Sequence, residues 1–578
     1  MYSVYCTLLE KRDLLSKIKW VIFFIFLLSG NNIFPQTQVI ESTNSVYVFL
    51  KRMHVSGNLD PYDDVVLPFS KRKIANYLNM LENTKSFLKT SDRKLLDKYL
   101  LQYPTMEIDS FSVSLIDENN FIPTEILFGQ KENHLYVYQD SLIIFQLDGI
   151  LSSRNYFANN YHNFNGSSSI LSYGGSFNLN YKEWVGVHGA AWNGPQYGDR
   201  EIAKIDQQTA QSFSFNSTKI RYVDGTKGYI NFQNDLGSLV FGRERILWGT
   251  GAVHKIGLDK TPQLFDFIKL NLSYKKFQYD FLHGWLVEKT YRIVVDSVGG
   301  TKNDKISKYV ALNRIGFSPT KYLSFGVTQT VIYSNRPMEA AYLNPFLLWE
   351  SAQRSMNDLD NSFLTFDFRY RLTDGILLNS SLLMDDINFN NLFNGKWSTQ
   401  SNGTVIQVGA EVIPSAISEK LFLQFDYLQI RPFTFSHPSV RSSLSYTNNG
   451  FLLGPDYQPN SAVFTSKLSY YFNEDITAQI KFEYYLHGEN ILNSNGETID
   501  NVGGDVFSPA NFYTPYERYF LAGNLTKVSE LQITLNWEPV YSTVIELQGN
   551  YQISIRDDLR KRSLFFALIF SYNFRSLD

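Results

Sequence analysis

The sequence predicts an all-β transmembrane barrel of about eighteen antiparallel strands, preceded by a small N-terminal α-helical domain. Three observations support this prediction. Apolar and polar residues alternate with a period of two in long segments from about residue 135 onward. Short and long connections between these segments alternate along the chain. A helical period of apolar residues is confined to about residues 44–104.

Composition favours a large surface that faces something other than water. Of the 578 residues only 19% are charged, whereas 16% are aromatic, including 37 Tyr and 45 Phe. That combination is unusual for a soluble globular protein. The net charge of −3 gives no basic field for nucleic acid, so we expect no nucleic-acid partner.

Residues 1–36 are predicted to be a secretory signal peptide. Basic residues precede the apolar run Trp20–Leu28, and small or polar residues follow it, with cleavage expected near Gln36. An N-terminal membrane anchor is the alternative, but nine apolar residues are too few to span a bilayer. The only cysteine is Cys6, so cleavage leaves a chain without disulfides or thiol chemistry.

Residues 37–130 are assigned to a helical domain and its connection to the barrel. Apolar residues repeat at helical spacing in two segments, 46–53 and 74–81, with Gly57 ending the first and Ser70 capping the second. Ser91 is predicted to cap a third helix that ends at Tyr103. Each helix has one apolar stripe, so the three are expected to pack on one another as a scaffold or docking module.

Residues 131–578 are assigned to the barrel. In Ile476–His487 the residues of one face are Ile, Ala, Ile, Phe, Tyr and Leu, while the other face includes Lys481 and Glu483. Runs of this length suit tilted membrane strands better than the short strands of a sandwich. Segments with this pattern begin near residues 136, 172, 184, 227, 238, 266, 277, 308, 322, 361, 375, 404, 419, 461, 475, 525, 541 and 563.

The connections alternate in length almost without exception. Tight turns occur at 182–183, 236–237, 319–321, 373–374 and 473–474, whereas 193–226, 247–265, 288–307, 335–360, 387–403, 431–460 and 488–524 are long. Outer-membrane barrels have short periplasmic turns and long extracellular loops. An even strand number then places the helical domain in the periplasm. A soluble secreted β-protein is the alternative, but it would need a second layer to cover its apolar faces.

The stretch Gly242–Gly257 contains Gly249-Thr250-Gly251 after an apolar run. It is not a dinucleotide loop, because His254 stands where the third glycine of that pattern belongs, and it is not a P-loop, because no Lys-Ser/Thr pair follows. The strand pattern predicts that it begins a long, outward-facing loop, in which the glycines allow a sharp turn.

These residues resemble those of the Wzi-type capsule assembly proteins of the outer membrane. The resemblance rests on ordered motifs: Gly242-Arg243, Trp248-Gly249-Thr250-Gly251, Leu258, Pro262, Phe265-Asp266, Asn313-Arg314-Ile315-Gly316-Phe317, Val331-Ile332-Tyr333, Tyr342-Leu343-Asn344-Pro345, Val48-Phe49-Leu50 and Leu67-Pro68-Phe69-Ser70-Lys71-Arg72. Thr250 departs from the family, in which a proline is expected there. The resemblance implies an eighteen-stranded barrel with a periplasmic helical bundle.

The resemblance also implies a lectin-like, non-catalytic role in holding or assembling capsular or other surface polysaccharide. The expected partners are that polysaccharide and outer-membrane lipid; docking of a polysaccharide export complex stays open. We expect a monomer without cofactor or metal. A nutrient porin is the main alternative, because eighteen strands leave a wide lumen unless something fills it. An adhesin is a third possibility.

Aromatic rings and arginine forks at the long-loop ends are candidates for polysaccharide contact, since guanidinium groups bind carboxylates bidentately. The candidates are Arg243, Arg245, Trp248, Arg336, Glu339, Tyr342, Asn344 and Trp349, with Trp192, Arg200 and Trp397 in neighbouring loops. The competing interpretation is structural: aromatic residues at strand ends form membrane-interface girdles, and lumenal arginines form charge ladders.

Catalysis finds little support in the sequence. The eight histidines are scattered, and neither H-E-x-x-H nor G-x-S-x-G occurs. The adjacent pairs Asp63-Asp64 and Asp385-Asp386 lie on turn-like stretches and are expected to be solvated. A hydrolase assembled from several strands stays an alternative.

Overall fold

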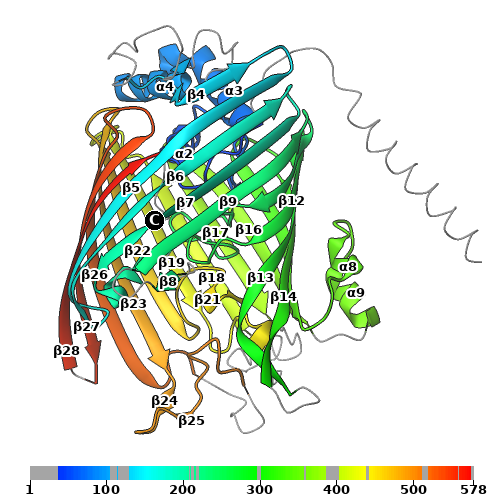
Figure 1. Ribbon diagram of the computed structural model, residues 1–578, viewed down its shortest axis with the longest axis vertical. Helices are drawn as coiled ribbons and strands as arrows, with labels where there is room; N and C mark the ends of the chain where they lie inside the picture. The colour runs from blue at the N-terminus through cyan, green and yellow to red at the C-terminus, as the bar shows by residue number, and fades with distance from the viewer. Residues whose placement is uncertain are drawn as a thin grey trace, which may run out of the picture.

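The computed structural model shows a closed antiparallel β-barrel with helices at one end (Figure 1). It describes residues 37–103, 113–114, 129–206, 209, 214–216, 221–295, 301–356, 360–385, 403–437, 442–510, 519–557 and 559–573. The predicted signal peptide and Trp397 lie outside the described residues. Among the described residues no helix has the length and apolar character needed to cross a membrane.

Eighteen strands of the described part form the closed wall. They are β5 Ile143–Tyr161, β6 Phe164–Tyr181, β7 Val185–Gly198, β9 Arg221–Gln233, β10 Gly237–Arg243, β12 Asp266–Tyr274, β13 Phe277–Val295, β14 Thr301–Phe317, β15 Leu323–Ser334, β16 Asn361–Thr373, β17 Ile376–Asp385, β18 Gly403–Val412, β19 Leu421–Ile430, β22 Ser461–Tyr471, β23 Ile476–Glu489, β26 Asn524–Trp537, β27 Thr543–Arg556 and β28 Leu559–Tyr572. Pairing of β28 with β5, from Leu564↔Asn159 to Tyr572↔Leu151, closes the ring. The short strands β4 Tyr136–Gln139 and β8 Ser214–Asn216 pair with β5 and β9, respectively.

The predicted fold class and strand number are confirmed, with corrections at several strand ends. A strand does begin at Tyr136, but it is the short β4, and the wall strand β5 begins at Ile143. The strands expected near 172, 227 and 308 begin instead at 164, 221 and 301. The alternation of short and long connections also has exceptions at the long-loop end. There β5 ends at Tyr161 with β6 beginning at Phe164, and β27 ends at Arg556 with β28 beginning at Leu559.

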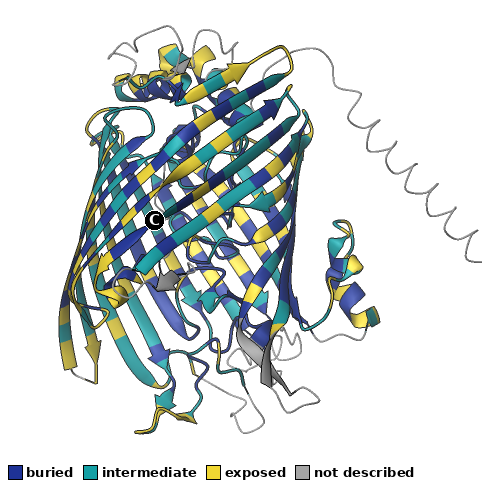
Figure 2. Ribbon diagram, viewed as in Figure 1, coloured by how far each residue is buried: buried dark blue, intermediate teal, exposed yellow. Residues whose placement is uncertain are grey.

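Side-chain burial alternates along the wall strands, which Figure 2 shows as stripes. In β28, Phe566 and Leu568 are 51% and 46% exposed on the outer face, whereas Phe565 and Ile569 are buried on the inner face. In β23, Phe482 is exposed and the charged Lys481 and Glu483 face inward, forming an ion pair at 2.7 Å. An exposed apolar outer face is the property of a barrel that spans a lipid bilayer.

The N-terminal region contains α2 Ser45–Val55, α3 Lys71–Asn83, the short 3-10 helix η1 Lys85–Phe87 and α4 Thr90–Gln102. The predicted cap of α3 is confirmed, because the Ser70 side chain accepts a hydrogen bond from Lys73 N. The predicted cap of α4 is wrong. Ser91 lies inside its first turn, with its hydroxyl 3.5 Å from Glu419 Oε1.

These helices pack on one another and also on the short-turn end of the barrel. Val55 O accepts a hydrogen bond from Gly375 N, Arg52 donates to Glu419 O, and Lys98 donates to Glu474 O. The helices and the wall share one apolar cluster, to which the barrel contributes Leu377, Phe422 and Tyr471. The head is therefore seated in the barrel mouth rather than carried on a separate stalk.

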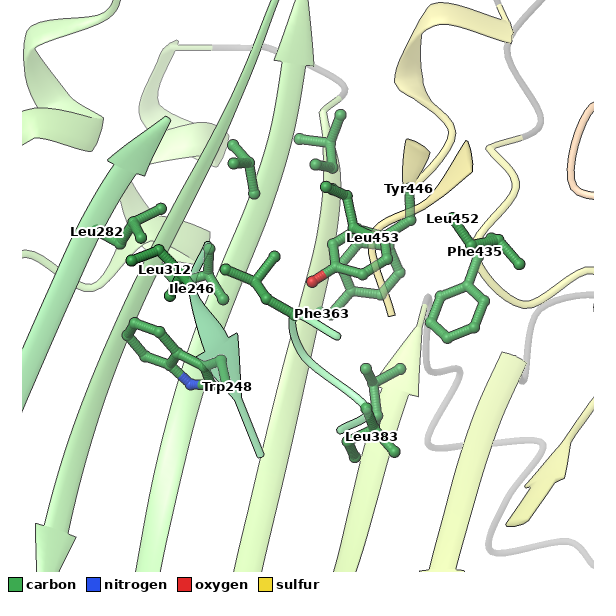
Figure 3. Close-up of a cluster of buried hydrophobic side chains, with 14 of the residues drawn as sticks. Ile246, Trp248, Leu282, Leu312, Phe363, Leu383, Phe435, Tyr446, Leu452 and Leu453 are labelled. Atoms are coloured by element: carbon green, nitrogen blue, oxygen red, sulfur yellow. The ribbon is translucent and has the colours of Figure 1, made fainter. Parts of the chain in front are cut away.

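A second apolar cluster lies inside the lumen (Figure 3). It joins inward side chains of the wall, including Leu282, Leu312 and Phe363, to side chains from the long connections, including Trp248 and Leu453. The loops that follow β10 and β19 thus fold into the barrel. The expectation that residues 247–265 form an outward-facing loop is wrong, because large apolar residues such as Trp248 and Leu258 are buried in the lumen.

Candidate functional site

The glycine turn after β10 directs the chain into the lumen. Gly249 adopts φ +148°, a conformation that side-chain-bearing residues rarely take, and its N–H donates to Val65 O at 2.8 Å. A Cβ on Gly251 would lie 2.1 Å from both Gln407 Nε2 and His254 O. Just before the turn, β11 Leu247–Trp248 pairs with β1 Val66–Leu67 of the head. The path of the chain into the lumen therefore requires glycine at both positions.

The same loop reaches the opposite wall. The Asp426 carboxylate on β19 accepts hydrogen bonds from the backbone N–H groups of Ala252, Val253 and His254, at 3.1, 2.6 and 2.9 Å. Thr250 Oγ1 lies 2.6 Å from Ser381 Oγ on β17. The loop therefore crosses the lumen from β10 to β17 and β19 and obstructs it. We call residues 247–258 the crossing loop.

Trp248, predicted to contact polysaccharide, is an anchor of the crossing loop. Its side chain is 2% exposed and packs in the lumenal cluster, and its indole N–H donates to Thr328 Oγ1 at 3.4 Å. A ring with both faces covered has no surface for a sugar. The arrangement gives Trp248 a packing role.

Arg243 and Arg245, predicted together, lie on opposite sides of the wall. Arg243 shares the outer face with Phe241 and binds Asp266 of β12 through two hydrogen bonds of 2.9 Å. Arg245 follows the end of β10 and is buried in the lumen, 4% exposed. The alternation of the strand ends at Arg243, which is why equal spacing did not put both on one face.

Arg245 lines a cavity of about 60 Å³ between the head and the wall. Trp192 and Lys227 also line the cavity. The Trp192 indole packs over Gly225, and Lys227 forms an ion pair with Glu41, with its Nζ 3.5 Å from Glu244 Oε2. It adjoins a polar cavity of about 170 Å³ beside the head. Both are smaller than pockets that enclose a drug-sized ligand, so they have room for one polar substituent rather than a length of polymer.

Five of the other predicted residues lie outside the barrel. The connection between β15 and β16 contains α8 Ala340–Leu343 and α9 Trp349–Met356, which sit against the outer wall (Figure 1). Tyr342 and Trp349 are 0% exposed and pack on Phe281, Tyr309 and Tyr333 of the outer face.

The polar residues of this connection are tied to the same structure. Arg336 binds Asp360 at 2.5 Å and Glu339 at 3.1 Å, and Tyr342 Oη donates to Asp360. Asn344 is exposed and accepts a hydrogen bond from Phe346 N. The five residues therefore brace one external hairpin and do not face the lumen.

Asp63 and Asp64, expected to be solvated, lie instead between head and wall, where Asp64 is buried and Asp63 half-buried. Asp64 binds Lys51 at 3.0 Å and Arg369 at 2.8 Å, and Asp63 binds Arg314 at 3.3 Å. Burial disfavours the charged carboxyl of Asp64, but Lys51 and Arg369 outweigh it and hold its pKa well below the usual value. These ion pairs fix the head inside the barrel.

The neighbouring wall contributes a further charged contact that sequence reasoning missed. Arg314, which is 0% exposed, also forms two hydrogen bonds with Asp367, at 3.0 and 2.7 Å. No local sequence pattern marks these contacts, because Arg314 is 53 residues from Asp367 and 251 residues from Asp63. Among the residues that the structure describes, no group of His, Cys, Asp and Glu is arranged to hold a metal ion.

The fold and this interior define a class: a closed eighteen-stranded barrel with a helical head, whose lumen is crossed by its own loops. The capsule assembly protein Wzi family matches residues 151–556. The chain belongs to this family.

Solved structures that resemble the chain share little sequence with it. Wzi from Escherichia coli, described as an outer-membrane protein involved in group 1 capsule assembly and a carbohydrate-binding β-barrel, is 12% identical with a TM-score of 0.54, covering 92% of this chain and 98% of that one. OprD from Pseudomonas aeruginosa is 12% identical with a TM-score of 0.39, covering 74% and 94%. OpdK from Pseudomonas aeruginosa is 8% identical with a TM-score of 0.40, covering 74% and 98%. No curated protein matches the chain.

Proposed function

We propose that this chain is an outer-membrane barrel that binds capsular or other surface polysaccharide and helps to assemble or hold it at the cell surface, without catalysis. Membership of the Wzi family over residues 151–556 carries the proposal. The Escherichia coli relative is described as a carbohydrate-binding barrel of capsule assembly, which supports the same role here.

In the proposed orientation the head lies in the periplasm and the long loops face the exterior. The head packs on the short connections at Gly375, Glu419 and Glu474, and short turns are periplasmic in barrels of this type. The first and last wall strands, β5 and β28, begin and end at this same side.

The crossing loop favours binding over conduction. A nutrient porin needs a continuous aqueous path, whereas hydrogen bonds from Ala252, Val253 and His254 to Asp426 hold a loop across the lumen. The porin alternative therefore has less support than the binding role.

We place polysaccharide contact at the long-loop end, where aromatic rings are exposed. Tyr197, the second-last residue of β7, is 51% exposed, and Tyr519, in the connection between β23 and β26, is 77% exposed. Of the residues expected to touch polysaccharide, Trp248, Tyr342 and Trp349 have no exposed ring, and we assign them structural roles. The small cavity lined by Arg245 is the second place that we assign to contact with one polar substituent of the polymer.

The test is binding of the purified protein to surface polysaccharide extracted from the cells that produce it. Tyr519→Ala should weaken binding roughly twofold to tenfold, since an aromatic contact contributes about 0.5–1.5 kcal/mol. Tyr274→Ala is the matched control, because Tyr274 is 61% exposed but lies at the short-turn end. Binding that is lost in Arg245→Met but kept in Tyr519→Ala would move the site to the cavity. No binding by the wild type would refute the function.

A further inference from the structure

The hairpin described over residues 335–356 belongs to the outer wall and not to the barrel mouth. Beyond the buried Tyr342 and Trp349, its tip is fixed to the wall toward the short-turn end. Pro345 O accepts a hydrogen bond from Tyr279 Oη, and Phe346 stacks on the Tyr279 ring at a centroid distance of 5.6 Å. Tyr279 is two residues from the start of β13 at the short-turn end, whereas the hairpin leaves β15 at the long-loop end. The connection therefore runs along the exterior of the barrel from the long-loop end toward the short-turn end.

The hairpin covers polar side chains that the outer wall would otherwise present to lipid. Gln329 donates to Asn313 at 3.3 Å and accepts a hydrogen bond from Trp349 N at 3.1 Å. His283 Nε2 lies 2.8 Å from Tyr333 Oη. Polar groups facing hydrocarbon are costly unless they are hydrogen-bonded, so this cover makes the patch compatible with a bilayer.

Apolar and polar groups are segregated along the exposed surface of the hairpin. Phe346 and Leu348 at the tip are 79% and 68% exposed, continuous with the apolar outer wall, in which Ile315 is 60% exposed. The exposed side of α9 is polar instead, with Ser351 and a Glu350–Arg354 ion pair at 2.9 Å. Elements at a membrane interface place an apolar face in the acyl region and a polar face among headgroups.

We propose that this hairpin is an interfacial membrane element, with residues 345–348 inserted among lipid acyl chains and the polar side of α9 in the headgroup layer. The inference rests on the proposed outer-membrane location. We assign lipid as the surroundings of the tip because the tip continues the apolar outer wall. In water, the large apolar side chains of Phe346 and Leu348 would stay exposed to solvent.

Single cysteines carrying an environment-sensitive fluorophore test this placement. Cys6 is the only native cysteine, so Cys6→Ser gives a clean background for labelling. The probe positions are Phe346→Cys and Leu348→Cys, with Ser351→Cys as the polar control on α9 and Ile533→Cys, 52% exposed on β26, as the control for barrel insertion. The full chain is reconstituted in phosphatidylethanolamine–phosphatidylglycerol vesicles with nitroxide-labelled acyl chains, and aqueous iodide is the opposing quencher.

The proposal predicts blue-shifted emission and strong acyl-chain quenching at 346, 348 and 533, with at least threefold weaker acyl-chain quenching at 351. Quenching at 533 together with iodide accessibility at 346 and 348 would overturn the hairpin proposal alone. Iodide accessibility at 533 would instead overturn the membrane location itself. Protection of 346 and 348 from both quenchers would indicate a protein contact, such as a second copy, and would also refute the lipid assignment.

Discussion

Replacing Asp426 with alanine should release the crossing loop and open the lumen. Asp426 is 1% exposed, and its carboxylate accepts hydrogen bonds from the backbone N–H groups of three successive residues, Ala252, Val253 and His254. Alanine would leave these three donors without that acceptor. Asp426→Asn is the matched control, because its amide oxygen keeps part of the acceptor function and its volume is nearly the same.

The size of the effect follows from the hydrogen bonds lost. A buried donor without a partner costs about 1–3 kcal/mol, so three cost at most about 3–9 kcal/mol, less whatever water restores. A change of about 5.5 kcal/mol moves a two-state equilibrium from 1:99 to 99:1. Because Trp248 still anchors the start of the loop, we expect a measurable fraction of open barrels rather than complete opening.

Planar-bilayer conductance and amide hydrogen exchange measure the two halves of this reasoning. Wild type should be almost silent electrically, Asp426→Ala should show frequent current steps, and Asp426→Asn should lie between them. Exchange at residues 252–254 should accelerate in the same order. Faster exchange without current would show that the crossing loop is not the barrier, and unchanged exchange would show that Asp426 does not hold it.

Three further predictions concern the head, its pH response and the external hairpin. Arg314→Met breaks buried ion pairs and should destabilise the barrel by about 3–5 kcal/mol in thermal unfolding, whereas Arg354→Met, 79% exposed at the side chain, should change little. Burial lowers the pKa of His134, but hydrogen bonds to Asp148 and Glu132 outweigh it and raise that pKa to about 9. The resulting stabilisation, about 3 kcal/mol at most, should be complete below pH ~6.5 and lost as pH rises through about 9; proteolysis of the head should follow this curve in wild type and not in His134→Gln. Trp349→Ala should cost about 3–5 kcal/mol of local packing and speed tryptic cleavage in the hairpin, while Leu348→Ala should not.

The barrel could be predicted from sequence because each wall residue faces one of two environments. Phe565 and Phe566 are the same residue type, yet Phe565 is 3% exposed and Phe566 is 51% exposed. The alternation of positions along the strand, and not the residue type, therefore determines which face a side chain occupies. The misplaced start of β6 has the converse cause. After Phe164, the next residues of β6, Asn165 to Ser169, are all polar or glycine, and no alternation of hydropathy marks them as a strand.

The destination of the loops was harder to predict. Trp248, Ile256 and Leu258 in a supposed outward loop were a usable signal, since large apolar residues clustered in a loop favour burial. The local sequence does not determine whether a loop helix packs on the inner or the outer side of the wall. The buried face of α9, formed by Trp349, Ala352 and Gln353, would suit the lumen and the exterior equally. Asp63 looked solvated because its partner Arg314 lies on a distant strand.

Deletion of this protein, with surface and released polysaccharide quantified in the same culture, tests the central claim most directly. The account predicts that polymer moves from the cell surface into the medium while total synthesis is unchanged, and that wild-type protein restores retention. Unchanged surface polymer together with reduced uptake of small solutes would contradict the account and favour a porin.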